Sequence, residues 1–462
     1  MSPADTDVRS GAPELTAEIF VIPGPGGRQL VFAPRQRAAF LCNDSAVSSL
    51  ADLAAKRQAR DRSTVDAEFV GFLRSLRLVD GPPDALPEPD VTGDPRPTSV
   101  TLFMTTACNL RCTYCYASAG DTPGEFMPLS TALQGIDFIV DNARALGEKQ
   151  ITVAYHGGGE ATANWDVMTD SWEYAAAAAD RYGLTLRALT ATNAAIPEAK
   201  AAWIAEHLDG ASVSFDGLPH LHDLQRPSAS GRGSSASIER TLELFDRVGF
   251  DYQLRLTVTE ALLPFLAVAV QYLCDNFSAK RIQLEPVYPE GRGSDLPAID
   301  PDRFVELFLE AESIGRAYGR TVYFSAARFG MVTRHFCGVT RDSFALTPTG
   351  DVSACYEAFS DGSDLAGDFF YGRLSGGKGV QLDPVALSRL RARTVDKRPY
   401  CEGCFAKWSC AGDCHVKHMA HEGSEHEPPR CRITRAITRH QILERISEHG
   451  GLFWHEPAPE QS

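Results

Sequence analysis

The chain has 462 residues, of which 44% are hydrophobic, and its formal net charge is −15. This length exceeds the roughly 250–300 residues that one core supports, so we expect two or three domains. The negative charge argues against nucleic acid or an anionic membrane surface as a partner, and no stretch approaches the roughly 20 apolar residues of a membrane span. Because the amino terminus lacks an apolar signal, we expect a cytoplasmic protein whose twelve cysteines are reduced.

The amino-terminal part of the sequence predicts a small separate domain. Residues 1–14 are small, polar and charged, which is typical of a disordered terminus. The apolar patterns after them predict two strands joined by a Pro/Gly-rich turn and then two helices, over 18–22, 29–33, 45–56 and 64–78. We therefore expect a small α/β domain over 15–80. Six prolines between Pro82 and Pro97 predict an extended linker over 81–97.

From residue 98 onward the pattern alternates between strands and helices. The expected strands are 99–106, 150–156, 184–191, 211–215, 252–259 and 281–287. The expected helices include 129–146, 165–182, 236–248 and 301–318. This alternation predicts parallel βαβ units, and six units fit a partial (β/α)6 TIM-like barrel over 98–330 better than a closed barrel of eight. In such a fold the site gathers at the carboxyl ends of the strands.

Past residue 330 the alternation stops and cysteine becomes frequent. This change predicts a cysteine-rich domain over 331–435, with a helix at about 433–447 and a tail within 436–462. Cys42 and Cys274 lie outside the two groups of cysteines, and we expect both to be structural thiols.

Three cysteines, Cys108, Cys112 and Cys115, stand close together after the first barrel strand. Three thiolates can hold three irons of a [4Fe–4S] cube and leave the fourth iron open to a small ligand. Zinc is the main alternative, because clustered cysteines are often zinc ligands. Only one CxxC pair occurs here and no histidine lies nearby before His156, so the spacing favours iron–sulfur.

This CxxxCxxC spacing, followed by Tyr116, resembles the radical S-adenosylmethionine (radical SAM) enzymes. The resemblance implies that the open iron binds SAM and cleaves it reductively to a 5′-deoxyadenosyl radical. The electron would come from an external donor such as flavodoxin or ferredoxin. The cofactor would thus supply the difficult chemistry, and the protein would orient the cofactor and shield it from solvent.

The same resemblance implies a SAM pocket built from residues after successive strands. Gly158, Gly159 and Glu160 resemble the GGE motif that contacts the methionine amino group, with Ala161 where the family usually has proline. The other positions that match the family are Asn193 for the ribose, Ser214 and Arg226 for the methionine carboxylate, and Tyr116 beside the adenine. Arginine suits the carboxylate because its fork donates two parallel hydrogen bonds.

Seven further cysteines follow, at Cys337, Cys355, Cys401, Cys404, Cys410, Cys414 and Cys431. On spacing alone, four of them could make a zinc knuckle, namely Cys401, Cys404, Cys410 and Cys414. The full pattern resembles the SPASM domain, which implies two auxiliary [4Fe–4S] clusters and three clusters in total. By that resemblance, the first auxiliary cluster takes Cys337, Cys355 and Cys414. The second takes Cys401, Cys404, Cys410 and Cys431. The first is one ligand short, which predicts an open iron or a non-cysteine ligand.

Three functions follow from these resemblances. The first is a peptide maturase that abstracts hydrogen from a ribosomally made precursor peptide and forms a cross-link or another oxidative modification. The second is a formylglycine-generating enzyme like the anaerobic sulfatase maturases, which carry aspartate where this chain has Tyr356, followed by Glu357. Both residues are candidates for proton transfer. The third is a non-catalytic metal-cluster scaffold. The domain over 15–80 favours the first, because its pattern resembles winged-helix-like leader-peptide recognition domains.

Overall fold

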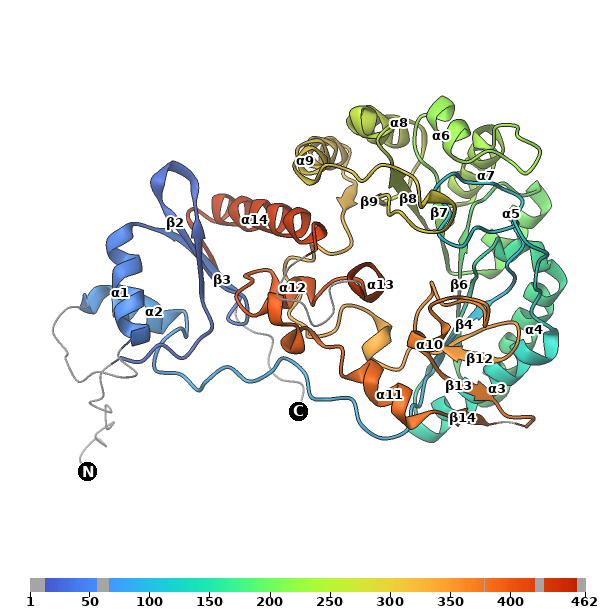
Figure 1. Cartoon of the computed structure of the whole chain (residues 1–462), viewed down its shortest axis with the longest axis horizontal. Coiled ribbons are helices and arrows are strands. Elements are labelled where there is room, and N and C mark those ends of the chain that lie inside the picture. Colours follow the sequence, from blue (N-terminus) through green and yellow to red (C-terminus); the bar gives the residue numbers. More distant parts are fainter. Residues whose placement is uncertain (1–12, 56–65, 378, 420–427, 455–462) are drawn as a thin grey trace.

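The structure is a computed structural model that describes residues 13–55, 66–377, 379–419 and 428–454. Figure 1 shows a small amino-terminal unit beside a large arc of strands and helices, with the C-terminal part (orange and red) between them. Four of the predicted segments lie partly outside the described residues: the disordered terminus over 1–14, the helices over 45–56 and 64–78, and the tail. The positions concerned are 1–12, 56, 64–65 and 455–462.

The small unit holds an antiparallel sheet in the order β1-β2-β3-β15, with helices α1 and α2 packed against it. Its elements are β1 Phe20–Pro23, β2 Gln29–Ala33, β3 Ala38–Cys42, β15 Leu452–Trp454, α1 Asp44–Ala55 and α2 Ala67–Ser75. Strands and helices share a core of their own, with Val31, Phe40, Leu50 and Leu73 at its centre. Three strands of this sheet are local in sequence, whereas the fourth comes from the other end of the chain.

The large sheet has eleven strands in the order β10-β9-β8-β7-β6-β5-β4-β11-β12-β13-β14. Pairing is parallel from β10 to β11 and antiparallel from β11 to β14. The first seven strands are β4 Ser99–Phe103, β5 Gln150–His156, β6 Thr185–Thr192, β7 Gly210–Ser214, β8 Tyr252–Val258, β9 Arg281–Pro286 and β10 Thr321–Tyr323. The remainder are β11 Ala345–Leu346, β12 Asp351–Ser353, β13 Phe370–Leu374 and β14 Val380–Leu382.

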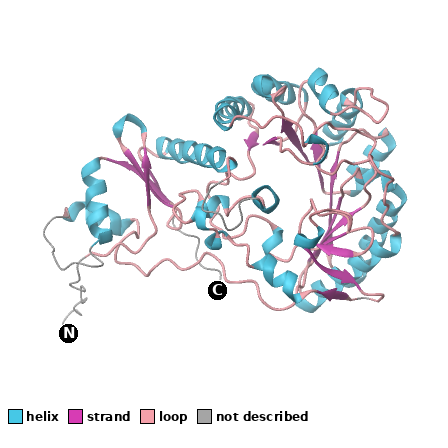
Figure 2. Cartoon of the chain, viewed as in Figure 1, coloured by secondary structure: helices cyan, strands magenta, loops and turns pink. Residues whose placement is uncertain are grey.

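The connecting helices lie on the outer side of this arc (Figure 2). They are α3 Leu129–Leu146, α4 Trp165–Tyr182, α5 Glu198–His207, α6 Pro219–Gln225, α7 Ser235–Val248, α8 Leu266–Asn276 and α9 Pro301–Ala317. Alternate strand residues such as Ile151, Val153 and Tyr155 are buried against the helices. The intervening side chains therefore face the inside of the arc.

The C-terminal part carries short helices and one long one. They are α10 Ala366–Phe369, α11 Pro384–Arg391, α12 Lys407–Cys410, α13 His415–His418 and α14 Arg430–Glu448. Among the described residues, no helix is both long and apolar enough to cross a membrane.

Charged contacts fasten the small unit and the proline-rich segment to the C-terminal part. The Glu18 carboxylate accepts a hydrogen bond from the Trp408 indole. The nearly buried guanidinium of Arg334 donates to Asp90 over 2.7 Å and to Asp396 over 2.8 Å. Glu88 pairs with Arg341. The segment is thus held to the C-terminal part at Glu88 and Asp90.

The parallel α/β part of the fold agrees with the sequence prediction. Helices α3 and α4 have the predicted bounds, and the six predicted strands all occur as parallel neighbours. The prediction missed the short strands β10 to β14, which have two to five residues, as well as β3 and β15. Two or three residues are too few to show a period of two, so β10, β11, β12, β14 and β15 leave no pattern in the sequence.

Candidate active site

A cavity of about 610 Å³ lies inside the arc. Its wall includes the loops that follow β4, β5 and β6, and the last residue of β7, so it lies at the carboxyl ends of the parallel strands. Two groups of cysteines line it: Cys108, Cys112 and Cys115 from the loop after β4, and Cys337, Cys355 and Cys414 from the C-terminal part. A cavity of this size accommodates a small-molecule ligand.

The three thiols of the first group influence one another. Burial, together with the nearby Glu160, Cys112 and Cys115, raises the pKa of Cys108 to about 12. Burial also raises the pKa of Cys112, which Arg226 opposes. The raised pKa values keep Cys108 and Cys112 as neutral thiols in the absence of metal. Binding of a metal cluster would deprotonate them, because thiolates are the ligands.

Arg292, from the loop after β9, holds the cysteine loop in place. Its backbone N–H donates to the Cys115 carbonyl over 2.9 Å, and its guanidinium donates to the Cys112 carbonyl over 2.7 Å. The same guanidinium donates to the Ala119 carbonyl over 3.0 Å and to Asp121 over 2.6 Å. The Arg292 side chain thus ties the cysteine loop, at Cys112 and at Asp121, to the loop after β9.

Replacing Arg292 with alanine is expected to loosen this loop and weaken metal retention. Hydrogen bonds of a charged donor each contribute about 1.5–3 kcal/mol, so iron should leave to a chelator on the order of tenfold faster. The measurement is the loss of iron absorbance over time after anaerobic reconstitution. The matched control is Arg303→Ala, which removes an exposed pair with Glu306 on α9. Equal rates for the two variants would contradict the role of Arg292.

The glycine run after β5 packs directly on the cysteine loop. The Gly159 N–H donates to the Thr105 carbonyl over 3.0 Å, and the Glu160 N–H donates to the Ala107 carbonyl over 2.9 Å. A Cβ at Gly159 would lie 2.1 Å from the Ala107 oxygen, and one at Gly158 would lie 2.4 Å from the Phe359 ring. Glycine is thus required at both positions, because the Ala107 carbonyl and the Phe359 ring leave no room for a Cβ.

Glu160 is nearly buried and is fixed by four donors. Its Oε1 accepts from the Thr162 N–H over 3.2 Å and from the hydroxyls of Thr162 and Thr192, each over 2.8 Å. Its Oε2 accepts from the Asn193 N–H over 2.7 Å. Oε2 accepts only one of these four hydrogen bonds, so it has room for another donor, such as an ammonium group.

Arg226 lies at the cavity with an unused donor. Its Nη1 donates to the Tyr114 hydroxyl over 2.8 Å, and that hydroxyl donates to the Asp216 carboxylate over 2.5 Å. The buried Nε of Arg226 has no hydrogen-bond partner among the described residues. Ser214, at the end of β7, lines the same cavity. An orphaned guanidinium N–H is a strong donor for a carboxylate.

Asn193 and Tyr116 also line the cavity, and the structure gives each a definite contact. The Asn193 amide donates to Asn109 Oδ1 over 2.8 Å and to the Cys108 sulfur over 3.7 Å. It therefore supports the cysteine loop. The Tyr116 hydroxyl donates to the Gly157 carbonyl over 3.4 Å, and its ring makes an edge contact with Phe359.

The second group of cysteines forms two subsets in the structure. Cys337 lies close enough to raise the pKa of Cys355, although burial is the larger cause, and Cys414 lines the same cavity wall. The remaining four are neighbours of one another, because Cys404, Cys431 and Cys401 each raise the pKa of Cys410 beyond the effect of burial and Asp413. Cys274 is buried in α8 within the main core, away from both groups.

Tyr356 and Glu357 lie side by side on the cavity wall. The Tyr356 hydroxyl is 3.0 Å from the Thr101 hydroxyl, and its ring packs beside His156. Lys417 donates to Glu357 over 3.1 Å and also pairs with Glu290. Burial nevertheless raises the pKa of Glu357, and Lys417 opposes this rise.

Comparison with known families now decides the identity of this site. Residues 102–264 match the model of the radical SAM superfamily. Residues 102–264 are a radical SAM domain. The matched region contains the cysteine loop, the glycine run, Asn193, Ser214 and Arg226.

Two curated relatives match most of the chain. Mycofactocin maturase MftC of Mycolicibacterium smegmatis is 28% identical over 336 residues, which are 69% of this chain and 78% of that protein. A serine-type anaerobic sulfatase-maturating enzyme of Klebsiella aerogenes is 24% identical over 326 residues, 67% of this chain and 77% of that protein.

Solved structures show the same radical SAM fold. The structure of anSMEcpe with bound AdoMet has a TM-score of 0.59 at 16% identity and covers 76% of this chain and 99% of its own. Streptococcus suis SuiB bound to precursor peptide SuiA has a TM-score of 0.50 at 13% identity and covers 90% and 98%. At these identities the likeness concerns the fold.

Radical SAM membership implies one [4Fe–4S] cluster and SAM, and the residues present fit both. Cys108, Cys112 and Cys115 supply three thiols at the cavity, as an open cube requires. Glu160 Oε2 and Arg226 Nε offer an acceptor and a donor, which suit the ammonium and carboxylate of an amino acid.

Sequence reasoning missed several residues that shape this radical SAM site. Arg292 and Phe359 act through contacts with loops distant in the sequence, so no local motif marks them. Tyr114 lies inside the cysteine motif, yet its bond to Asp216 appears only in three dimensions.

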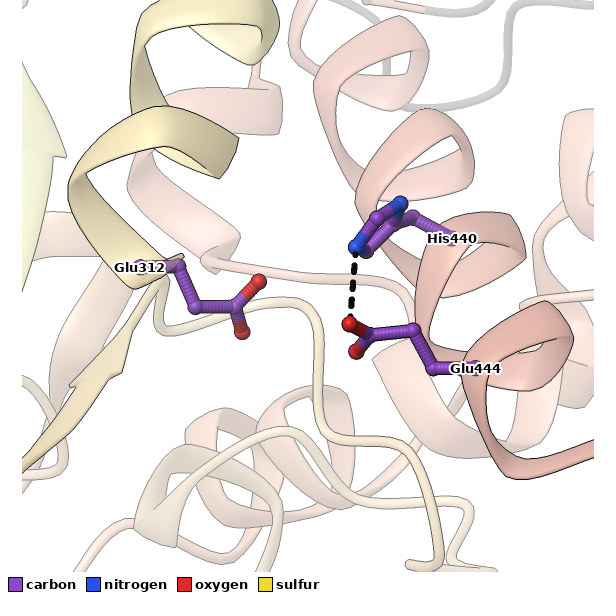
Figure 3. A group of neighbouring side chains, drawn as sticks. All are labelled: Glu312, His440 and Glu444. Carbon is purple, nitrogen blue, oxygen red and sulfur yellow. Dashed lines mark ion pairs between the residues drawn. The ribbon is translucent and has the colours of Figure 1, made fainter. Parts of the chain in front are cut away.

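A further group of possible metal ligands lies away from the cavity, between α9 and α14 (Figure 3). Glu312 faces His440 and Glu444, and their ligand atoms lie within 4.8 Å of one another. Arg316 donates to both oxygens of Glu444, over 2.6 and 2.9 Å. A bound guanidinium already neutralises this carboxylate, so the group is an ion-pair network that joins the two helices.

Proposed function

We propose that this chain is a peptide maturase that uses SAM and three [4Fe–4S] clusters to oxidise a ribosomally made precursor peptide. The observation that carries this proposal is the cavity shared by two cysteine sets, Cys108–Cys115 and the group of Cys337, Cys355 and Cys414. A substrate in that cavity would lie between a group that generates a radical and a group that accepts an electron. The similarity to a mycofactocin maturase supports the same class.

The roles of the chain's own residues follow from the geometry. When bound, the cluster and SAM supply a 5′-deoxyadenosyl radical that removes hydrogen from the substrate. Glu160 would accept from the methionine ammonium, while Arg226 and Ser214 would hold its carboxylate. Asn193 would fix the cysteine loop beside the ribose, and Tyr116 would flank the adenine. These contacts aim the reactive atom and keep water away from it.

The C-terminal cysteines would hold the auxiliary clusters in a SPASM-like domain. Cys337, Cys355 and Cys414, which line the cavity, would ligate the first. Cys401, Cys404, Cys410 and Cys431 would ligate the second. Tyr356 and Glu357 would move a proton from the substrate, because both line the cavity. An external flavodoxin or ferredoxin would supply the first electron.

Anaerobic co-expression with each short open reading frame beside the gene tests this function. Mass spectrometry of the peptides should show a loss of about two hydrogens on one of them, as net oxidation requires. The matched control is the same strain with the Cys112→Ala variant, which should leave every peptide unchanged. No mass change with an enzyme that still cleaves SAM would overturn the peptide assignment.

A second candidate is formylglycine formation on a sulfatase, favoured by the similarity to a sulfatase-maturating enzyme. At the position where those enzymes carry aspartate, this chain places Tyr356, whose hydroxyl is engaged with Thr101. Incubation with sulfatase peptides that carry serine or cysteine at the target distinguishes the two, because only this candidate gives an aldehyde. Radical SAM membership argues against a non-catalytic scaffold.

The small unit over 15–80 would recognise the leader of the precursor. Three antiparallel strands followed by two helices suit binding of a peptide along a sheet edge. Truncation does not isolate this role cleanly, since Glu18 binds Trp408 and Glu88 binds Arg341 of the C-terminal part. Point variants at the sheet edge are therefore preferable.

A further inference from the structure

The edge of β3 in the small sheet is paired with a strand from the far end of the chain. β15 runs antiparallel to β3, with Leu452 opposite Phe40, Phe453 opposite Ala39 and Trp454 opposite Ala38. Without β15, this edge would present unpaired backbone groups. The C-terminal strand therefore occupies the position that an added peptide strand would take.

The side chains of β15 contact both faces of the small sheet. Leu452 packs against the core of the small unit, and Phe453 is 7% exposed and belongs to the main core. The Phe453 ring lies 5.4 Å from that of Phe329 and 5.5 Å from that of His449. Leu452 and Phe453 thus pack into apolar cores on opposite sides of the edge, which suits an extended segment with adjacent large apolar residues.

The attachment of β15 consists of few residues. The strand has three residues and joins α14 through Gly450 and Gly451, whose φ values are 73° and 112°. A Cβ at either glycine would meet nothing within 4 Å, so the backbone conformation and not crowding favours glycine there. A three-residue strand on two glycines can be displaced without unfolding α14.

The opposite edge of the sheet is less suited to a new strand. β1 has four residues and ends in Pro23, which has no N–H to donate. The Pro23 carbonyl already accepts from Arg439 of α14 over 2.9 Å. The missing N–H of Pro23 and the hydrogen bond from Arg439 therefore both favour the β3 edge for a new strand.

We propose that the β3 edge is a peptide-binding site that β15 occupies at rest, and that the precursor peptide binds there by displacing β15. The bound segment would be extended and would carry neighbouring large apolar residues, as Leu452 and Phe453 do. The identification of the bound peptide as the precursor rests on the proposed function. Because β15 is tethered, it competes at high effective concentration and lowers the apparent affinity of any peptide in solution.

The first test uses the full chain with Leu452→Ser and Phe453→Ser, and a fluorescent synthetic peptide with the sequence of residues 449–462. The variant should bind this peptide, and the unaltered chain should bind it at least tenfold more weakly. Amide exchange at residues 38–42 should be faster in the variant and should slow again when the peptide is added. A control peptide carrying the same two serines should not bind.

Two outcomes of this first test would overturn the site. In one, the variant keeps a cooperative thermal transition but does not bind the peptide. In the other, the unaltered chain binds the peptide as tightly as the variant. If the double variant does not fold, Phe453→Ser alone gives the same comparison with one buried ring removed. These results do not depend on any precursor, so they remain valid if the proposed function fails.

The second test uses the peptide that co-expression identifies by its changed mass. Its affinity for the double variant should exceed that for the unaltered chain by at least tenfold. Equal affinities would show that the precursor binds at another surface, and would overturn that part of the proposal while leaving the strand site standing.

Discussion

Replacing Cys112 with alanine is expected to abolish SAM cleavage and to remove about four iron atoms per chain. Cys112 lies between Cys108 and Cys115 in the loop that lines the cavity, and its carbonyl is held by Arg292. Loss of one of three thiolate ligands leaves a cube with two protein ligands, which cannot remain bound at an open cavity. The measurement is iron content after anaerobic reconstitution, together with 5′-deoxyadenosine formed with a chemical reductant.

Cys274 supplies the matched control for this experiment. It is buried in α8, within the main core, and lies in neither cysteine group. Cys274→Ala should keep its iron and its SAM cleavage, and should lose only the stability that one buried thiol contributes. Iron loss from Cys274→Ala, or full activity in Cys112→Ala, would contradict the assignment of the catalytic cluster.

The parallel part of the fold could be predicted because its signals are local. Helices α3 and α4 show a helical period over eighteen residues each, and each ends at a glycine with φ near 70°. Strands β4 to β9 have five to eight residues, which is enough for an apolar run to stand out. Consecutive parallel strands end at one edge of the sheet, so the motifs after β4, β5 and β6 were expected to meet, and they line one cavity.

The remaining features depend on pairs of residues that are distant in the sequence. β15 joins β3 although the two stand near opposite ends of the chain, and neither pattern indicates a partner. Arg292 lies between two glycines in a turn and resembles a surface residue in the sequence. In the structure its guanidinium donates to the carbonyls of Cys112 and Ala119 and so fixes the cysteine loop. Such contacts are set by tertiary packing, which a single sequence does not encode locally.

Asn193 shows how a residue can line the expected cavity and still have an unpredicted partner. The resemblance placed it at the ribose, and it does follow β6 and line the cavity. Both amide hydrogens, however, point at the cysteine loop, towards Asn109 and the Cys108 sulfur. The strand order predicted the location of this residue, whereas its hydrogen bonds depend on side chains that no periodicity constrains.

Arg226→Ala is expected to raise the dissociation constant for SAM at least about 30-fold, which corresponds to about 2 kcal/mol for truncating one partner of a buried charge pair. The Nε of Arg226 is buried and unpaired among the described residues, so a ligand carboxylate would complete its hydrogen bonds. The measurement is equilibrium binding of SAM to the reconstituted enzyme, with thermal denaturation as a check on folding.

Two further variants separate binding from folding. Arg232→Ala is the matched control, because this exposed residue of the following loop bonds only to nearby serines and should leave SAM affinity unchanged. Arg226→Lys keeps a positive charge beside Asp216, whose pKa burial raises and Arg226 lowers. Lysine cannot reproduce the fork, so this variant should remain folded but still bind SAM weakly. SAM affinity equal to that of the unaltered chain in Arg226→Lys would mean that charge alone suffices, and would assign the carboxylate contact to Ser214.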